Sequence, residues 1–127
     1  MQSRAKFLGR LATEHEHGKM VIGEIQQLVG QGRYEFSIHA QGERLDEDLD
    51  VTDIEAAILP GEILEDYPGD PRGESCLILG FAGQKPVHIV LGWARRGDQG
   101  ERVLRIITVY VPRAPKWRDP RTRGGEP

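Results

Sequence analysis

The chain has 127 residues and a mass of 14.2 kDa, enough for one domain that buries a core without metals or disulfides. Its formal net charge is -3, and its apolar runs fall far short of the roughly 20 residues that cross a bilayer. The single cysteine, Cys76, cannot form an internal disulfide. We therefore expect no membrane span and no disulfide framework, and we expect a cytoplasmic protein.

Charge is unevenly distributed along the sequence. Residues 43–70 contain eleven acidic residues against Arg44, whereas residues 71–127 contain eleven lysines and arginines against five acids. Such a chain can present a cationic face to phosphates and an anionic face to a basic partner. Solubilising charge without a partner explains the same composition equally well.

Residues 1–19 show no sustained hydrophobic period, and we expect a disordered or frayed extension. His15 and His17 form an H-x-H pair, but no third or fourth ligand accompanies them nearby. We predict no metal site and no cofactor.

Three helices are predicted before the strands. Apolar residues recur at helical spacing between residues 20 and 30, and Ser37 can cap a second helix whose Ile38, Leu45 and Leu49 share a stripe. A third helix follows a T-x-x-E capping box formed by Thr52 and Glu55. The "EFSIHAQGERLDED" stretch, residues 35–48, thus belongs mostly to the second helix.

After Gly61 the hydrophobic period changes to two. Strands are predicted over residues 63–67, 76–82, 86–93 and 103–111, with the Val87, Ile89, Leu91 and Trp93 set turned toward the helices. Helices followed by strands indicate an α+β domain over residues 20–117, with the helices on one face of a roughly four-stranded antiparallel sheet. Residues 118–127 are predicted to be a basic flexible tail.

Two residues near the start of this tail suit nucleic acid. Lys116 can contact a phosphate and Trp117 can stack on a base. Alternatively, Trp117 pins the tail onto the sheet, and the neighbouring arginines are merely solvated.

Several blocks recur in order in one known family: "LVGQGRYEFSIHAQGERLDEDLDVTDIEAAI", "GEILEDYPGDPRGESCLILGF", "KPVHIVLGW" and "IITVYVP" with a following "KW". The chain resembles, roughly over residues 21–117, a prokaryotic family of short domains of unknown function. That family is grouped with the barnase, EndoU, colicin and RelE ribonuclease fold. The resemblance implies a RelE/barnase-like fold, a toxin of a toxin-antitoxin pair, and a nearby YgiT-type zinc-finger antitoxin as in MqsR-type modules.

The family pattern implies a His-Ala pair at the start of the second helix, matched by His39 and Ala40, and an arginine about one turn later, matched by Arg44. A spacing of five turns Arg44 about 140° away from His39 on an ideal helix. Either Gly42 permits a bulge that brings the two together, or His39 neighbours Glu43 instead.

A metal-independent ribonuclease needs a base for the 2′-hydroxyl, an acid for the departing 5′-oxygen, and cations for the phosphate. We predict His39 and His88 as the proton-transfer groups. The other predicted site residues are Arg44 and Arg72 on the phosphate, Tyr110 and Thr108 as orienting groups, and Lys116 with Trp117 as further RNA contacts.

Each of these residues has a structural alternative. His39 can simply hydrogen-bond near the helix start, His88 can be a half-buried strand histidine, Arg72 can pair with Asp66 or Asp70, and Tyr110 can belong to the core. For the whole protein, the alternative to an endoribonuclease is a non-catalytic module of the same fold that binds RNA or a protein. The RNA target and the oligomeric state are left open.

Overall fold

The computed structural model describes residues 19–96 and 100–124. Its three described helices are α2 (Ile22–Gly30), α3 (Ile38–Asp46) and α4 (Val51–Ile58). Its strands are β1 (Glu35–Phe36), β2 (Glu62–Tyr67), β3 (Ser75–Ala82), β4 (Lys85–Arg96), β5 (Glu101–Tyr110), β6 (Trp117–Asp119) and β7 (Thr122–Arg123). Residues 1–18, including His15 and His17, lie outside the described part.

The main sheet has five strands in the order β1-β5-β4-β3-β2, and β6 pairs with β7 in a separate two-stranded sheet. The α+β class is confirmed, but the expectation of roughly four antiparallel strands is wrong in two respects. The sheet contains an additional strand, and that strand, β1, runs parallel to β5. Two residues preceding a capped helix carry too short a pattern to predict as a strand.

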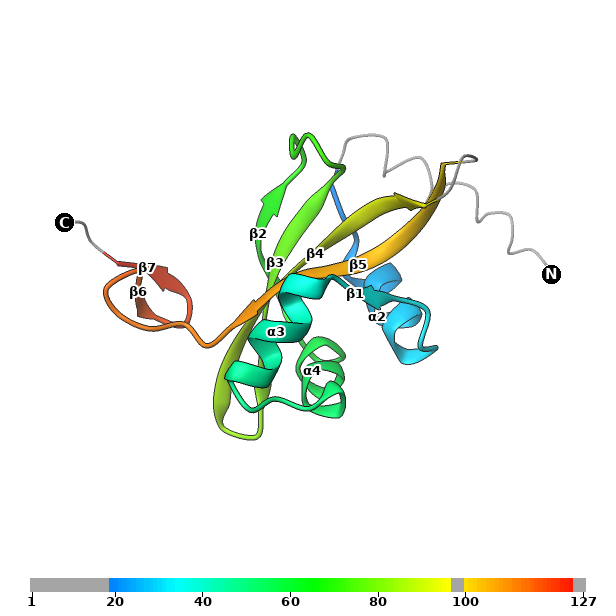
Figure 1. The fold of residues 1–127 in the computed structure, drawn as a ribbon. Coiled ribbons are helices and arrows are strands. Elements are labelled where there is room, and N and C mark those ends of the chain that lie inside the picture. Colours follow the sequence, from blue (N-terminus) through cyan, green and yellow to red (C-terminus); the bar gives the residue numbers. More distant parts are fainter. Residues whose placement is uncertain (1–18, 97–99, 125–127) are drawn as a thin grey trace.

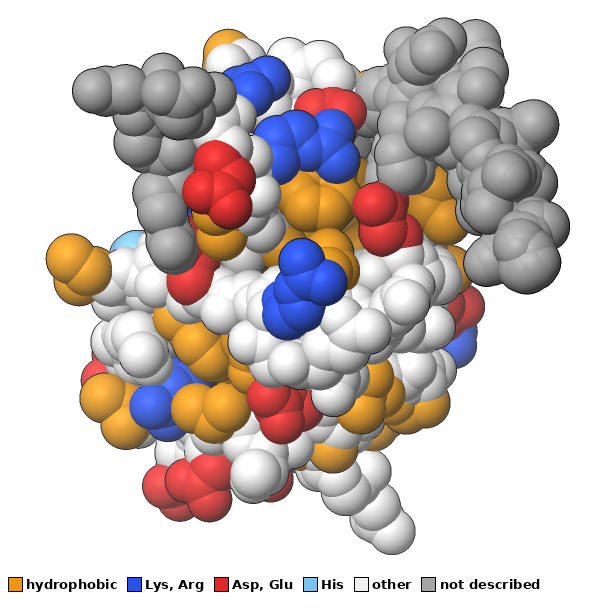
Figure 2. Space-filling model, turned by 90° about the vertical axis from the view of Figure 1, so that its right-hand side faces the viewer, with side chains coloured by type: hydrophobic (Ala, Val, Ile, Leu, Met, Phe, Trp, Pro, Cys, Tyr) orange, Lys and Arg blue, Asp and Glu red, His pale blue; other side chains and the backbone are white. Residues whose placement is uncertain are grey.

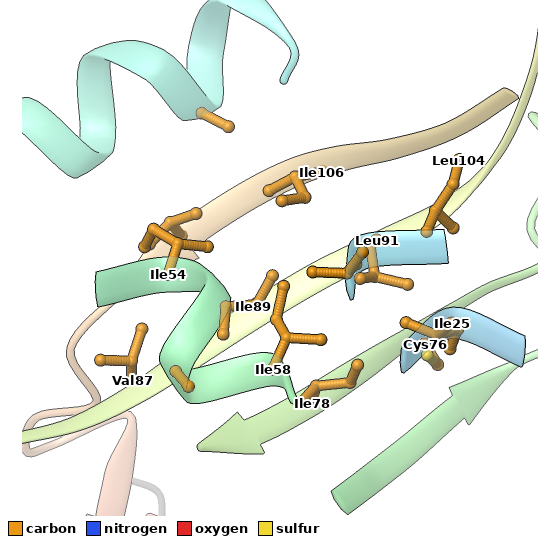
Figure 3. Close-up of a cluster of buried hydrophobic side chains, with 14 of the residues drawn as sticks. Ile25, Ile54, Ile58, Cys76, Ile78, Val87, Ile89, Leu91, Leu104 and Ile106 are labelled. Atoms are coloured by element: carbon orange, nitrogen blue, oxygen red, sulfur yellow. The ribbon is translucent and has the colours of Figure 1, made fainter. Parts of the chain in front are cut away.

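The main core lies between the sheet and the helices (Figure 3). Ile54 and Ile58 of α4 pack toward Ile78 of β3 and Ile89 of β4, and each of these side chains is fully buried. The strict alternation on β4 is confirmed, because its odd-numbered apolar residues join this core. We call the opposite face of the sheet, which carries the even-numbered residues of β4, the open face.

Helix α4 begins two residues earlier than the capping-box pattern predicts. Its N-cap is Asp50, and Asp53 accepts the Asp50 backbone N–H at 2.8 Å. The predicted Thr52–Glu55 capping box is therefore wrong, because Asp50 and Asp53 form the capping box instead. At the other end, α4 approaches β3 so closely that a Cβ on Gly80 would lie 1.9 Å from the carbonyl oxygen of Ala57.

Helix α3 has a different inward face from the one predicted. Ser37 caps it as expected, accepting the Ala40 N–H at 2.9 Å. However, Ile38 is 92% exposed and Leu45 is 66% exposed, and only Ala40 of this helix is buried. The predicted Ile38–Leu45–Leu49 stripe is therefore wrong for the first two residues, because α3 leans on β5 through its other side.

The segment predicted to be a flexible tail instead carries the β6–β7 hairpin, which lies on the side of the sheet away from α2 and α4 (Figure 1). Trp117 is 2% exposed and anchors this hairpin. Arg121 pairs with Glu62, and Arg123 pairs with Glu65 of β2 at 2.8 Å. Within the described residues, no helix is long and apolar enough to cross a membrane.

Candidate functional site

A β-bulge in β5 determines which side chains reach the open face. The pairing between β4 and β5 shifts after Leu91–Ile106, so that Val90 pairs with Thr108 and His88 with Tyr110. Ile107 is the extra residue of the bulge. As a result Arg105, on one side of the bulge, shares a face with Thr108 on the other, although strict alternation would separate them.

This rearrangement creates a cleft of about 620 Å³ between the N-terminus of α3, strands β4 and β5, and the loop before β3. We call it the His39 cleft. Its polar lining consists of Ser37, His39, Arg72, Arg95, Arg105 and Thr108. Three guanidinium groups, an imidazole and two hydroxyls therefore line one hollow.

His39 is held by an acidic side chain one turn further along α3. Its Nε2 lies 3.0 Å from the Glu43 carboxylate, while the His39 side chain is still 69% exposed. Glu43 is itself fixed, because its other oxygen accepts the Val109 backbone N–H at 2.8 Å. Val109 lies beyond the part of β5 that pairs with β1. The Glu43 carboxylate therefore accepts the hydrogen bond that a neighbouring strand would otherwise accept from the Val109 N–H. The expectation that His39 neighbours Glu43 if the helix stays regular is confirmed.

Arg44 does not join His39. Helix α3 runs without interruption through Gly42, and Arg44 donates to the Gln41 side chain at 2.7 Å and to the Leu49 carbonyl at 3.0 Å. Its guanidinium carbon lies 5.7 Å from the centre of the Phe36 ring. Arg44 therefore stabilises the end of α3, and its predicted role on the same phosphate as His39 lacks the required geometry.

The arginines of the cleft already have partners within the fold. Arg72 forms a forked contact with Asp70 at 3.0 and 2.9 Å, as its structural alternative predicted, and this contact lowers the pKa of Asp70. Arg105 pairs with Glu35 at 2.5 Å, and Arg95 donates to the carbonyl of Gly100. These contacts orient the guanidinium groups, and each group keeps donors for a further anion.

His88 lies on the same sheet face but at its other end, beneath the β6–β7 hairpin. It is 0% exposed, with Nε2 2.7 Å from the Pro120 carbonyl and Nδ1 3.1 Å from the Tyr110 hydroxyl. A carbonyl can only accept, so Nε2 carries the proton and Nδ1 accepts from Tyr110. The ring also packs edge-on against Trp117, with 4.4 Å between ring centres.

We call His88, Tyr110 and Trp117 the His88 cluster. Burial is the main cause of the pKa shifts in this cluster. It lowers the pKa of His88 and raises the pKa of Tyr110. Arg123, beside the cluster, lowers the pKa of Glu65 through its hydrogen bonds. His88 is thus a strand histidine with both ring nitrogens bonded, as its structural alternative had it, but it is fully rather than half buried. The role of His88 in proton transfer stays a prediction.

The predicted site residues thus fall into separate places. His39, Arg72 and Thr108 meet in the His39 cleft, whereas His88, Tyr110 and Trp117 form the buried cluster. Arg44 lies away from both, and Lys116 is exposed at the start of the hairpin, where its carbonyl accepts the Gly124 N–H.

Sequence reasoning missed Arg95 and Arg105 as members of the cleft. Arg95 sits in a loop-like "ARRGDQGER" pattern, and strict alternation without the bulge would place Arg105 on the opposite face from Thr108. The signal that was available is the excess of arginine in the second half of the chain.

Comparisons with known proteins place the chain in a family without assigning it an activity. No curated protein and no solved structure matches it. Residues 36–111, more than half of the chain, match the family model described as domain of unknown function (DUF4258). This range contains His39, Arg72, Arg105 and Thr108. The protein therefore belongs to the DUF4258 family.

Proposed function

We propose that the protein is a metal-independent endoribonuclease whose active site is the His39 cleft. The observation that carries the proposal is the convergence of one exposed, carboxylate-held histidine with three arginines in a single hollow. Histidine is the side chain best suited to proton transfer near neutral pH, and arginine is the side chain best suited to phosphate oxygens.

In the proposed reaction His39 removes the proton from a 2′-hydroxyl, and the freed oxygen attacks the adjacent phosphorus. The bond from phosphorus to the 5′-oxygen breaks, leaving a 2′,3′-cyclic phosphate, and the departing oxygen takes a proton from solvent in the open cleft. Glu43 stabilises the imidazolium that forms, because its carboxylate lies 3.0 Å from Nε2.

The arginines would counter the charge that develops on the phosphate. Arg105 and Arg72 approach the cleft from β5 and from the loop before β3, so a phosphate between them would meet guanidinium groups from two sides. Thr108 and Ser37 add hydroxyls at the floor, although the Ser37 hydroxyl already donates to the Ile107 carbonyl at 3.0 Å. His88 would take part only if the β6–β7 hairpin moved away.

The test is cleavage of a short RNA by the purified protein in the presence of a metal chelator. We expect a 2′,3′-cyclic phosphate product, no cleavage of a 2′-deoxy substrate, and a rate about 10²- to 10⁴-fold lower for His39→Ala. Gln41→Ala is the matched control, because Gln41 is exposed on the same helix and its side chain accepts a hydrogen bond from Arg44, which lies away from the cleft. Undiminished cleavage by His39→Ala would refute the proposal.

We further propose that this activity is that of a RelE/barnase-like toxin, acting in the cytoplasm and held by a zinc-finger antitoxin encoded nearby. Among the described residues, the order of α2, α3 and α4 before the antiparallel meander β2–β5 supports this proposal. Induction in a growing cell should arrest growth, and co-expression of the neighbouring small protein should restore it. Harmless induction of a protein that cleaves RNA in vitro would refute the toxin assignment.

A second candidate function, a non-catalytic protein-binding module, is favoured by one observation. Ile38 and Leu45 of α3 are largely exposed seven residues apart, on the same side of the helix, beside the acidic Asp46 and Asp48. A basic partner with an apolar stripe would cover this side. If Ile38→Ser abolished binding of such a partner while His39→Ala changed no measured property, the module would be the better assignment.

A further inference from the structure

A second hollow lies on the helix side of the β4–β5 ribbon. It has a volume of about 560 Å³ and is bounded by α2, the segment before β1, and the ends of β4 and β5. Leu28, Tyr34, Trp93, Arg33 and Arg102 are among its lining residues, and we call it the Trp93 hollow. On the face shown in Figure 2, lysine or arginine side chains lie over hydrophobic side chains and are flanked by acidic ones.

The centre of this hollow is a planar cation held over an aromatic ring. The guanidinium carbon of Arg102 lies 4.1 Å from the centre of the Trp93 ring, while Arg102 itself is exposed. Trp93 is partly buried against the main core, so the ring gives the guanidinium a fixed support. An arginine plane held in this way presents its outer side as a stacking surface for a base.

The charges around the hollow favour a base over a phosphate. Glu24 and Glu101 line it together with the two arginines, so its net charge is close to balanced, unlike that of the His39 cleft. Carboxylates repel phosphate oxygens but accept hydrogen bonds from the N–H groups on the edges of bases. The apolar floor of Leu28 and Tyr34 suits the flat face of a base.

The hollow and the His39 cleft lie on the two sides of the β4–β5 ribbon and share one lining residue, Trp93. Trp93 lines both, because β3 stops pairing with β4 at Gly92 and the β4–β5 ribbon projects beyond it as two strands. A single strand of RNA that leaves the cleft can therefore reach the hollow by crossing a ribbon of only two strands. A duplex, whose bases are stacked inward, has no free base to place in the hollow.

We infer that the Trp93 hollow is a nucleobase subsite that binds one unpaired base of the RNA strand held in the His39 cleft, with Arg102 on Trp93 as the stacking platform. The inference rests on the proposed function and adds to it that the substrate is single-stranded RNA. It assigns Arg102 a binding role that does not depend on its charge alone.

The test compares two kinds of short 2′-O-methyl RNA probe, which lack the attacking hydroxyl, by fluorescence anisotropy. The first probe carries all its bases. The second kind is a series in which each probe lacks the base at one position along the strand. Stacking of one base predicts that the wild type binds the complete probe about 5- to 100-fold more tightly than the best-placed abasic probe. In Arg102→Ala and Arg102→Lys this difference should disappear, because lysine keeps the charge but not the plane.

Arg118→Ala is the matched control, since Arg118 is an exposed arginine on β6, on the opposite side of the molecule (Figure 1). It should retain the full difference between the probes. If Arg102→Lys also retains it, Arg102 acts only through charge and the subsite is refuted. If the wild type cleaves RNA yet binds both probes alike, the subsite fails while the nuclease stands. If the wild type binds the complete probe preferentially but His39→Ala still cleaves, the nuclease assignment fails while the subsite stands.

Discussion

Replacing Gly80 with alanine should strongly destabilise the fold, because α4 rests directly on the backbone at that position. The added Cβ would lie 1.9 Å from the Ala57 carbonyl oxygen and 2.5 Å from its carbon. To restore even a tight contact of about 3 Å, the helix backbone must retreat by about 1 Å or more. Such a shift would pull Ile54 and Ile58, both fully buried, away from the sheet.

Overpacking of a well-filled core typically costs 1–3 kcal/mol, and a clash with backbone falls at the upper end. We therefore expect Gly80→Ala to lower the free energy of unfolding by about 3 kcal/mol. The same substitution at Gly42 is the matched control, since a Cβ there meets nothing within 4 Å and the residue lies inside α3. Gly42→Ala should raise stability by about 0.5–1 kcal/mol through the lower entropy of the unfolded chain.

Urea unfolding followed by circular dichroism measures both variants. With an m-value of 1–2 kcal/mol/M, the midpoint for Gly80→Ala should fall by about 2 M while the slope is unchanged. A loss below about 0.5 kcal/mol for Gly80→Ala would mean that α4 has room to move, and the close packing of α4 on β3 described above would be wrong. A loss of stability in Gly42→Ala would contradict the regular helix that separates Arg44 from His39.

Three further predictions concern the carboxylate beside His39, the pH dependence of stability and the reactivity of the single thiol. Glu43→Gln should lower kcat for RNA cleavage about tenfold or more with KM little changed, because it removes the anion beside His39. Glu47→Gln, which removes a carboxylate that pairs with Arg113 outside the cleft, should leave kcat unaltered, and equal losses in both variants would exclude a specific role for Glu43. Stability should fall as pH drops below about 6.5, since the lowered pKa of buried His88 means that the unfolded state takes up the proton first. Stability should fall a second time below about pH 4.3, because the unfolded chain takes up protons on Glu47 and Glu65 before the folded protein does, since their pKa values are lowered in the folded state. Unfolding curves measured from pH 8 to 3 test both falls. His88→Gln should remove only the first fall. Cys76 should react with a thiol reagent only after unfolding, because burial raises its pKa to about 12; rapid labelling of the native protein at pH 8 would contradict its placement in the core.

Local patterns in the sequence predicted most of the fold. The Ser37 cap and the inward face of β4 each follow from a periodic or chemical signal that acts over a few residues. Trp117, predicted as an RNA contact, is instead buried, as its structural alternative had it. The short parallel strand β1 and the inward face of α3 did not follow, because both depend on where β5 lies. A helix with one buried alanine and two exposed aliphatic residues gives a misleading hydrophobic stripe.

The candidate site was predictable only in part for the same reason. His39, Arg72 and Thr108 were found from residue type, and the structure places them around one cleft. Arg105 joins them only because Ile107 forms a bulge, and a bulge reverses the side on which every later residue of a strand points. Likewise, the burial of His88 depends on the hairpin that covers it, which a count of basic residues cannot reveal.

The position of the β6–β7 hairpin affects how the protein should be trimmed for laboratory work. The family match ends at residue 111 and begins at residue 36, yet Ile25 and Val29 of α2 lie in the core and Trp117 seals the space above His88. A recombinant fragment cut at the family boundaries would expose an aliphatic groove on one side and an uncovered imidazole on the other. A fragment meant to fold should therefore keep at least α2 and the β6–β7 hairpin, residues 22–123.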